Sequence, residues 1–245
     1  MNKPQLRNTA KRFLRKVGYD VNKYVAGDYS QRPAANKFQL LKYYNIDVVF
    51  DVGANTGRYG TELRHAGYTG RIISFEPLSS SYKQLRTVSA NDELWETTQS
   101  ALGDVDGAAE INISSNPQFS SILKVMPEAS QTVSQPTYVG KEEVVISRLD
   151  TILDAFIDEE EKLFLKIDAP GFVKQILDGA VGVIHKIAGI QVKTSLVTMY
   201  EGEYLINDMI SYVKDLGFNL TSIEPGFSNL ETGQLLQADL LFFRQ

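Results

Sequence analysis

A strand that leads directly into a glycine turn and then a helix is the feature that most constrains this chain. Residues 46–51 form an apolar run with β-branched residues that ends in an acid, and Val-Gly-Ala-Asn-Thr-Gly follows at residues 52–57. A helical pattern begins at Arg58. A tight turn between a strand and a helix lets a ligand lie against bare backbone, as in doubly wound α/β folds. Glycine at positions 53 and 57 permits the close approach or the backbone dihedrals that such a turn requires.

The acid at the end of this strand narrows the class of ligand. Asp51 would repel a pyrophosphate, but it can face a cationic or hydroxylated ligand. The spacing Asp-x-Gly-x-x-x-Gly therefore favours S-adenosylmethionine over NAD or ATP. A nicotinamide oxidoreductase is the weaker alternative, because the chain has no Gly-x-Gly-x-x-Gly motif after this strand.

The rest of the pattern predicts an α/β fold, a doubly wound Rossmann-like sheet that is mostly parallel with an antiparallel last strand. Strands are expected at 71–76, 95–102, 163–168, 189–195, 218–223 and 238–244, and helices at 58–66, 79–90, 173–178 and 204–216. Two further strands, at 108–114 and 142–149, flank a polar stretch and predict an inserted β-hairpin with a long loop. Long loops in compact domains often form lids or bind substrates.

Three acids at expected strand ends are candidates for the site. Glu76 lies 19 residues after Gly57, where an acid accepts hydrogen bonds from ribose hydroxyls; the alternative is a solvent-facing strand-end acid. Asp104 either meets the edge of an adenine ring or belongs to an ordinary Gly-Asp turn. Asp168 and Lys166 point to the same face, so they form either a base with a tuning lysine or a simple ion pair.

Composition excludes several kinds of site. The chain has no cysteine, which rules out disulfides, thiolate metal sites and cysteine nucleophiles. Its two histidines have no partner at metal-ligand spacing, so no metal site is expected. A net charge of −5 argues against nucleic-acid binding. The sequence shows neither a membrane span nor a secretory signal, so a cytoplasmic location is expected.

The N-terminal region is basic, and residues 1–40 are predicted to form a helical extension. Residues 1–24 contain seven basic residues against one acid, and apolar residues recur there at helical spacing. Either this helix makes peripheral contact with an anionic membrane or substrate, or it packs its apolar stripe on the main domain.

The order and spacing of these motifs resemble the FkbM family of S-adenosylmethionine-dependent methyltransferases over most of residues 40–245. The resemblance rests on segments 50–57, 75–77, 101–104, 120–121, 148–151, 165–168, 171–172, 200–203, 217–218 and 225–227. It implies a methyltransferase domain at 41–245 that methylates a hydroxyl, often on a sugar of a glycan, a polysaccharide or a natural product. The expected partner is thus a small-molecule or glycan acceptor.

Under this hypothesis the site residues divide into two groups. The cofactor site would comprise Asp51, Gly53, Asn55, Thr56, Gly57, Glu76 and Asp104. Asp168 is the expected base or acceptor-positioning group, with Lys166 and Glu201 as its neighbours.

The sequence departs from the family pattern on the acceptor side. The family usually has acids at the positions of Val173 and Lys193, and a polar residue at that of Pro170. The alternative to an active enzyme is therefore a catalytically impaired protein that binds S-adenosylmethionine or a partner without turnover.

Overall fold

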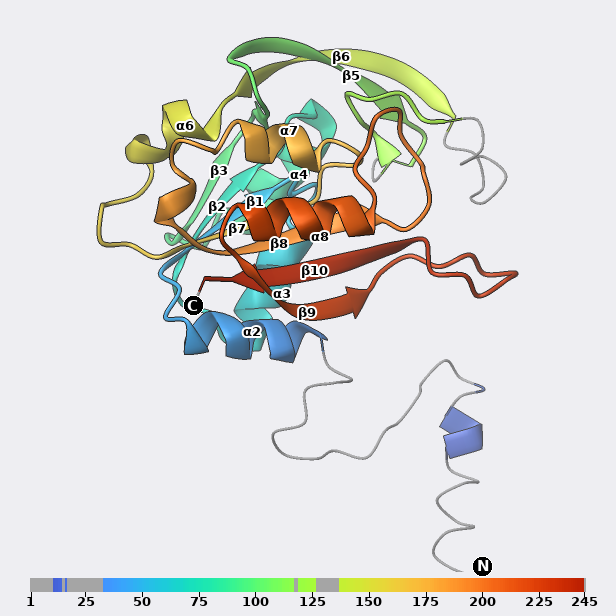
Figure 1. Ribbon diagram of the computed structural model, residues 1–245, viewed down its shortest axis with the longest axis horizontal. Coiled ribbons are helices and arrows are strands. Elements are labelled where there is room, and N and C mark those ends of the chain that lie inside the picture. The colour runs from blue at the N-terminus through green and yellow to red at the C-terminus, as the bar shows by residue number, and fades with distance from the viewer. Residues whose placement is uncertain (1–10, 15, 17–32, 117–118, 127–136, 245) are drawn as a thin grey trace, which may run out of the picture.

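The computed structural model describes residues 11–14, 16, 33–116, 119–126 and 137–244. Its centre is a seven-stranded sheet in the order β3-β2-β1-β7-β8-β10-β9 (Figure 1). The strands are β1 (Val48–Val52), β2 (Arg71–Phe75), β3 (Trp95–Thr98), β7 (Leu163–Ile167), β8 (Ile187–Ser195), β9 (Asn219–Pro225) and β10 (Gln237–Phe243). β10 runs antiparallel to both of its neighbours, and the other strand pairs are parallel. The predicted doubly wound sheet with an antiparallel last strand is confirmed.

Helices cover both faces of this sheet (Figure 1). The α-helices are α2 (Pro33–Tyr43), α3 (Arg58–Ala66), α4 (Ser79–Ser89), α6 (Leu149–Ile152), α7 (Val173–Asp178) and α8 (Ile206–Asp215), and the 3-10 helices are η2 (Leu153–Ala155) and η3 (Ile184–Lys186). In β1, Val48, Phe50 and Val52 face the core under α7 and α8, whereas Val49 faces the core under α2 and α3. Alternate residues of β1 therefore serve opposite faces, which is why the whole strand is buried.

A second, three-stranded sheet is inserted between β3 and β7. It has the order β4-β6-β5 and consists of β4 (Ala101–Leu102), β5 (Gly107–Ser114) and β6 (Tyr138–Ser147). The antiparallel pairing of β5 with β6 confirms the predicted hairpin. The single strand predicted at 95–102 is wrong, since it divides into β3 and β4. β2 ends at Phe75, opposite Thr98, so the following residues find their partners in β6 instead.

α2 joins the N-terminal region to the sheet. It runs across the boundary expected at residue 40, and Leu41 is buried in the core. Just after α2, Tyr44 stacks on Phe243 with ring centroids 4.0 Å apart. Residues 11–14 and 16 are helical, but the rest of the predicted basic helix lies outside the described residues. Among the described helices, none is long and apolar enough to cross a membrane.

Candidate functional site

A cleft of about 520 Å³ opens at the carboxyl ends of the parallel strands. Its two ends carry different side chains. The end over β1 and β2, here the Glu76 end, is lined by Gly53, Ala54, Asn55, Glu76, Leu78, Ala101 and Leu102. The end over β8 and β10, here the Asp239 end, is lined by Lys37, Phe119, Asp168, Lys193, Phe227, Gln237 and Asp239.

The β1–α3 loop forms the wall of the Glu76 end. Gly53, Asn55 and Gly57 all have positive φ, at 72°, 50° and 86°. A Cβ on Gly53 would lie 2.1 Å from the backbone carbonyl oxygen of Asp168, so only glycine fits there. The Asp168 N–H in turn donates to the Val52 carbonyl at 2.9 Å. The loop thus binds the ends of β1 and β7 tightly together.

Glu76 is held in place by this loop and by the segment between β2 and α4. Its Oε2 accepts a hydrogen bond from the Asn55 N–H at 2.8 Å, and its Oε1 accepts one from the Leu78 N–H at 3.0 Å. Burial raises the pKa of Glu76 to about 7, although these two bonds and the charge of Lys166 act in the opposite direction. Each oxygen keeps a lone pair. The carboxylate is therefore fixed at the cleft and can accept two further hydrogen bonds.

Asp51 is fully buried and holds Lys166 instead of facing the cleft. Lys166 Nζ lies 2.6 Å from Asp51 Oδ1 and also donates to the carbonyl of Gly53 at 3.3 Å. Ser74 completes the group, with its Oγ 3.5 Å from Asp51 Oδ2. Asp51 and Lys166 meet because they are in register on adjacent strands. Burial alone would lower the pKa of Lys166, but the charges of Asp51, Asp168 and Asp239 and the hydrogen bond to Asp51 together outweigh burial and raise it.

Asp168 pairs with Lys193 and not with Lys166. Lys193 Nζ donates to Asp168 Oδ2 at 2.5 Å, and both side chains are 30% exposed. Burial raises the pKa of Asp168, but the charges of Lys166 and Lys193 together lower it below its usual range. A carboxylate with a lowered pKa that already accepts an ammonium is a weak base.

Four of the other expected site residues lie elsewhere in the described structure. Thr56 and Gly57 shape the loop but do not line the cleft. Asp104 does not line it either, and its backbone carbonyl accepts a hydrogen bond from Arg148. Glu201 is exposed at a turn outside the cleft.

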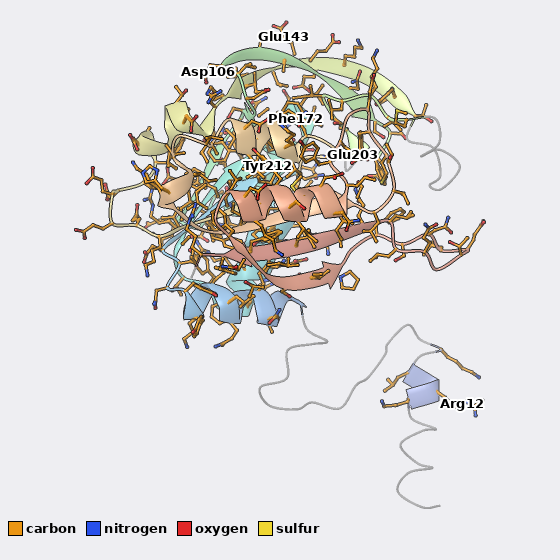
Figure 2. The ribbon with its side chains drawn as sticks, viewed as in Figure 1. Arg12, Asp106, Glu143, Phe172, Glu203 and Tyr212 are labelled. Carbon is orange, nitrogen blue, oxygen red and sulfur yellow. The ribbon has the colours of Figure 1, made fainter. Side chains whose placement is uncertain are left out.

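Glu203 is a structural residue that sequence reasoning missed (Figure 2). Its carboxylate accepts hydrogen bonds from the backbone N–H groups of Met199 and Tyr200 and from Ser195 Oγ. It thereby fixes the loop after β8. The glutamate two residues earlier in the same motif is the one that sequence analysis selected.

The Asp239 end is closed by segments distant in sequence. Phe119 and Phe227 meet edge to face across it, with centroids 6.1 Å apart. Ser121 Oγ donates to the Pro170 carbonyl at 2.6 Å, so the described part of the expected long loop forms a wall of the cleft. Lys37, Phe119 and Asp239 belong to none of the sequence motifs, and only the tertiary fold brings them near Phe227 of segment 225–227.

Comparison with known protein families identifies the family of this chain. The model of the methyltransferase FkbM domain matches residues 51–220. The chain belongs to the FkbM methyltransferase family. The expected family of S-adenosylmethionine-dependent methyltransferases is thus confirmed.

Solved methyltransferase structures are distant from this FkbM chain. Magnesium protoporphyrin IX methyltransferase from Synechocystis PCC 6803, with bound S-adenosylmethionine, is 11% identical, with a TM-score of 0.47 and coverage of 99% of this chain and 97% of that chain. The 1,6-didemethyltoxoflavin-N1-methyltransferase from Burkholderia thailandensis, with bound 1,6-didemethyltoxoflavin and S-adenosylhomocysteine, is 9% identical, with a TM-score of 0.48 and coverage of 98% and 86%. No curated protein sequence matches the chain significantly.

The FkbM cleft offers donors and carboxylates but no metal centre in its described part. Among the described residues, no group of three or more His, Cys, Asp or Glu side chains could hold a metal ion.

Proposed function

We propose that this protein is an S-adenosylmethionine-dependent O-methyltransferase that acts on a hydroxyl group, most simply that of a sugar in a glycan, a polysaccharide or a natural product. One observation carries the proposal. Glu76 is buried at the cleft with each carboxylate oxygen held by one loop amide, which leaves two lone pairs for a pair of hydroxyls. A ribose diol is the ligand group that matches this arrangement.

The Glu76 end fits S-adenosylmethionine. Glu76 would accept the ribose hydroxyls, Gly53 and Asn55 would present backbone beside the amino-acid part, and Ala101 and Leu102 would pack against the adenine. Asp51, Thr56, Gly57 and Asp104 would act through the shape of the surrounding loops. When bound, the cofactor supplies an electrophilic methyl group.

The Asp239 end would hold the acceptor. A sugar ring has apolar faces and polar edges, and this end combines Phe119 and Phe227 with Lys193, Gln237 and carboxylates. The Asp168–Lys193 pair would orient the acceptor hydroxyl through hydrogen bonds, and Lys166 would fix the loop that positions Asp168. Glu201 would lie outside contact range of the reacting groups. Positioning of the acceptor supplies most of the rate in such a transfer.

The test is methyl transfer from labelled S-adenosylmethionine to a panel of methyl glycosides and cell-surface glycans, with heat-denatured protein as control. We expect label in at least one acceptor and one-to-one binding of S-adenosylhomocysteine in calorimetry. The absence of binding by the wild-type protein would contradict the cofactor assignment. Binding without transfer to any acceptor would contradict the enzymatic assignment.

The Asp168–Lys193 pair favours one alternative, a protein that binds the cofactor without turnover. A base already paired with an ammonium has little proton affinity left, and Lys193 stands where the resemblance to the FkbM family implies an acid. The substitution Lys193→Glu distinguishes the two. If only the variant methylates the panel, the native protein is the impaired form.

A further inference from the structure

Two carboxylates flank Lys193 at the Asp239 end of the cleft, and only one of them is paired. Asp239 on β10 is the direct register partner of Lys193 on β8. Lys193 nevertheless donates to Asp168, which lies beyond the end of β7. Within the described part of the chain, the carboxylate of Asp239 has no hydrogen bond or ion pair, although it is partly buried and lines the cleft.

The other nearby lysines are also committed to carboxylates of their own. Lys37 on α2 lies 3.5 Å from Glu224, the register partner of Asp239 on β9. Lys166 is engaged by Asp51 at 2.6 Å. Asp239 therefore stands beside a second acid and forms no ion pair with a described lysine, although its charge acts on Lys166 at longer range. A partly buried carboxylate that lines the cleft and has no fixed partner can accept hydrogen bonds from a ligand bound there.

We infer that Asp239 is the catalytic carboxylate that binds the acceptor hydroxyl and takes its proton. This inference rests on the proposed O-methyltransferase function. As the acceptor oxygen forms its bond to the methyl carbon, the carbon–sulfur bond breaks with its electron pair kept on sulfur, and the hydroxyl proton passes to an oxygen of Asp239. The carboxylate becomes a neutral acid and returns the proton to water after the product leaves.

The contrast between the two carboxylates supports this division of roles. Asp168 accepts a hydrogen bond from the Lys193 ammonium, so one of its oxygens is already occupied, and its pKa is lowered. Asp239 keeps both of its oxygens free for the ligand. Asp168 and Lys193 then orient the acceptor, and Asp239 carries out the proton transfer.

The first test compares Asp239→Asn with Asp168→Asn, two isosteric changes at the same end of the cleft. The acceptor is the methyl glycoside that the wild-type protein methylates fastest in the panel. We expect Asp239→Asn to lower kcat by about 100-fold or more, the usual range for loss of a general base. We expect Asp168→Asn to lower kcat less and to raise the acceptor KM. Equal rates for wild type and Asp239→Asn would overturn the inference.

A second measurement separates proton transfer from cofactor binding. Calorimetry with S-adenosylhomocysteine should give the same Kd for Asp239→Asn as for wild type, within about twofold. A Kd that rises in step with the loss of activity would place Asp239 against the ammonium of the cofactor and overturn the inference.

Chemical rescue supplies a readout that a purely structural role would not move. Formate should restore part of the kcat of Asp239→Ala but not that of Asp168→Ala, because it replaces the missing proton acceptor. Rescue of Asp168→Ala alone would assign the base to Asp168 instead. If the wild-type protein binds S-adenosylhomocysteine but methylates no glycoside, the proposed function fails and this inference falls with it, whereas an active wild type with an unaffected Asp239→Asn contradicts the inference alone.

Discussion

The two ends of the cleft differ in how their charged side chains are buried and paired. At the Glu76 end, Lys166 and Asp51 are 6% and 0% exposed and are joined within a hydrogen-bonded row of buried groups. At the Asp239 end, Lys193 and Asp168 are each 30% exposed, and Asp239 is left without a partner in the described structure. The first arrangement is fixed by the register of adjacent strands. The second depends on side chains that a ligand can rearrange.

The charges of the Asp51–Lys166 pair therefore belong to the fold, whereas those at the Asp239 end are available to a ligand. A fully buried ion pair resists change, because removal of one partner leaves an uncompensated charge in the interior. A half-exposed pair is partly solvated, so it contributes little to stability and can exchange partners. The charged pair at the Glu76 end is thus held rigidly, whereas the pair at the Asp239 end is adaptable.

The largest expected effect is a loss of stability when the buried ion pair at the Glu76 end is broken. Lys166→Met leaves Asp51 buried without its cation and should lower the free energy of unfolding by about 3–5 kcal/mol. Urea denaturation followed by circular dichroism measures it. The double variant Asp51→Leu/Lys166→Met is the control and should recover much of the loss. A loss below about 1 kcal/mol in Lys166→Met would show that this pair is not part of the rigid structure.

The next effect concerns the pH dependence of cofactor binding. The pKa of Glu76 is about 7 in the free protein, and only the charged carboxylate accepts two hydroxyls. Affinity for S-adenosylhomocysteine should therefore rise about tenfold from pH 6 to pH 8 as Glu76 loses its proton, and then level off. Glu76→Gln cannot titrate and serves as the reference at each pH. A wild-type affinity that falls over this range, relative to the variant, would contradict the role of Glu76.

The smallest expected effect is the change in stability caused by a substitution at the Asp239 end. Lys193→Met makes the same chemical change as Lys166→Met one strand further along the sheet. Because its ion pair is partly solvated, we expect the free energy of unfolding to change by less than about 1 kcal/mol. The pKa of Asp168 should rise, since the ammonium that lowers it is removed. Urea denaturation in parallel with Lys166→Met gives the comparison, and equal losses would remove the distinction between the two ends.

Local pattern was sufficient for most of the fold. The bounds expected for helices 58–66 and 173–178 agree with α3 and α7, because glycine turns and apolar spacing define these ends locally. Glu76 was predicted at the end of its strand and lines the cleft. The division of 95–102 into two strands could not be predicted, because it depends on where β2 ends.

The ion-pair partners of the charged residues could not be predicted from the sequence either, because they also depend on neighbouring strands. Of the two alternatives for Lys166 and Asp168, the simple ion pair does not form, because strand register places Lys166 beside Asp51. The charge of Lys166 nevertheless lowers the pKa of Asp168. Lys193 and Asp239 belong to strands whose order along the chain differs from their order in the sheet. Contacts between neighbouring strands determine which charged residues meet at the Asp239 end, and no single segment of the sequence contains these contacts.

A calorimetric titration with S-adenosylhomocysteine at pH 8 of the wild type, Glu76→Gln and Lys193→Met tests whether the Glu76 end binds the cofactor. We expect one-to-one binding by the wild type, a loss of about 10- to 100-fold for Glu76→Gln through its weakened hydrogen bonds, and a change within about twofold for Lys193→Met. Undiminished binding by Glu76→Gln, or a loss confined to Lys193→Met, would contradict the assignment of the Glu76 end as the cofactor site.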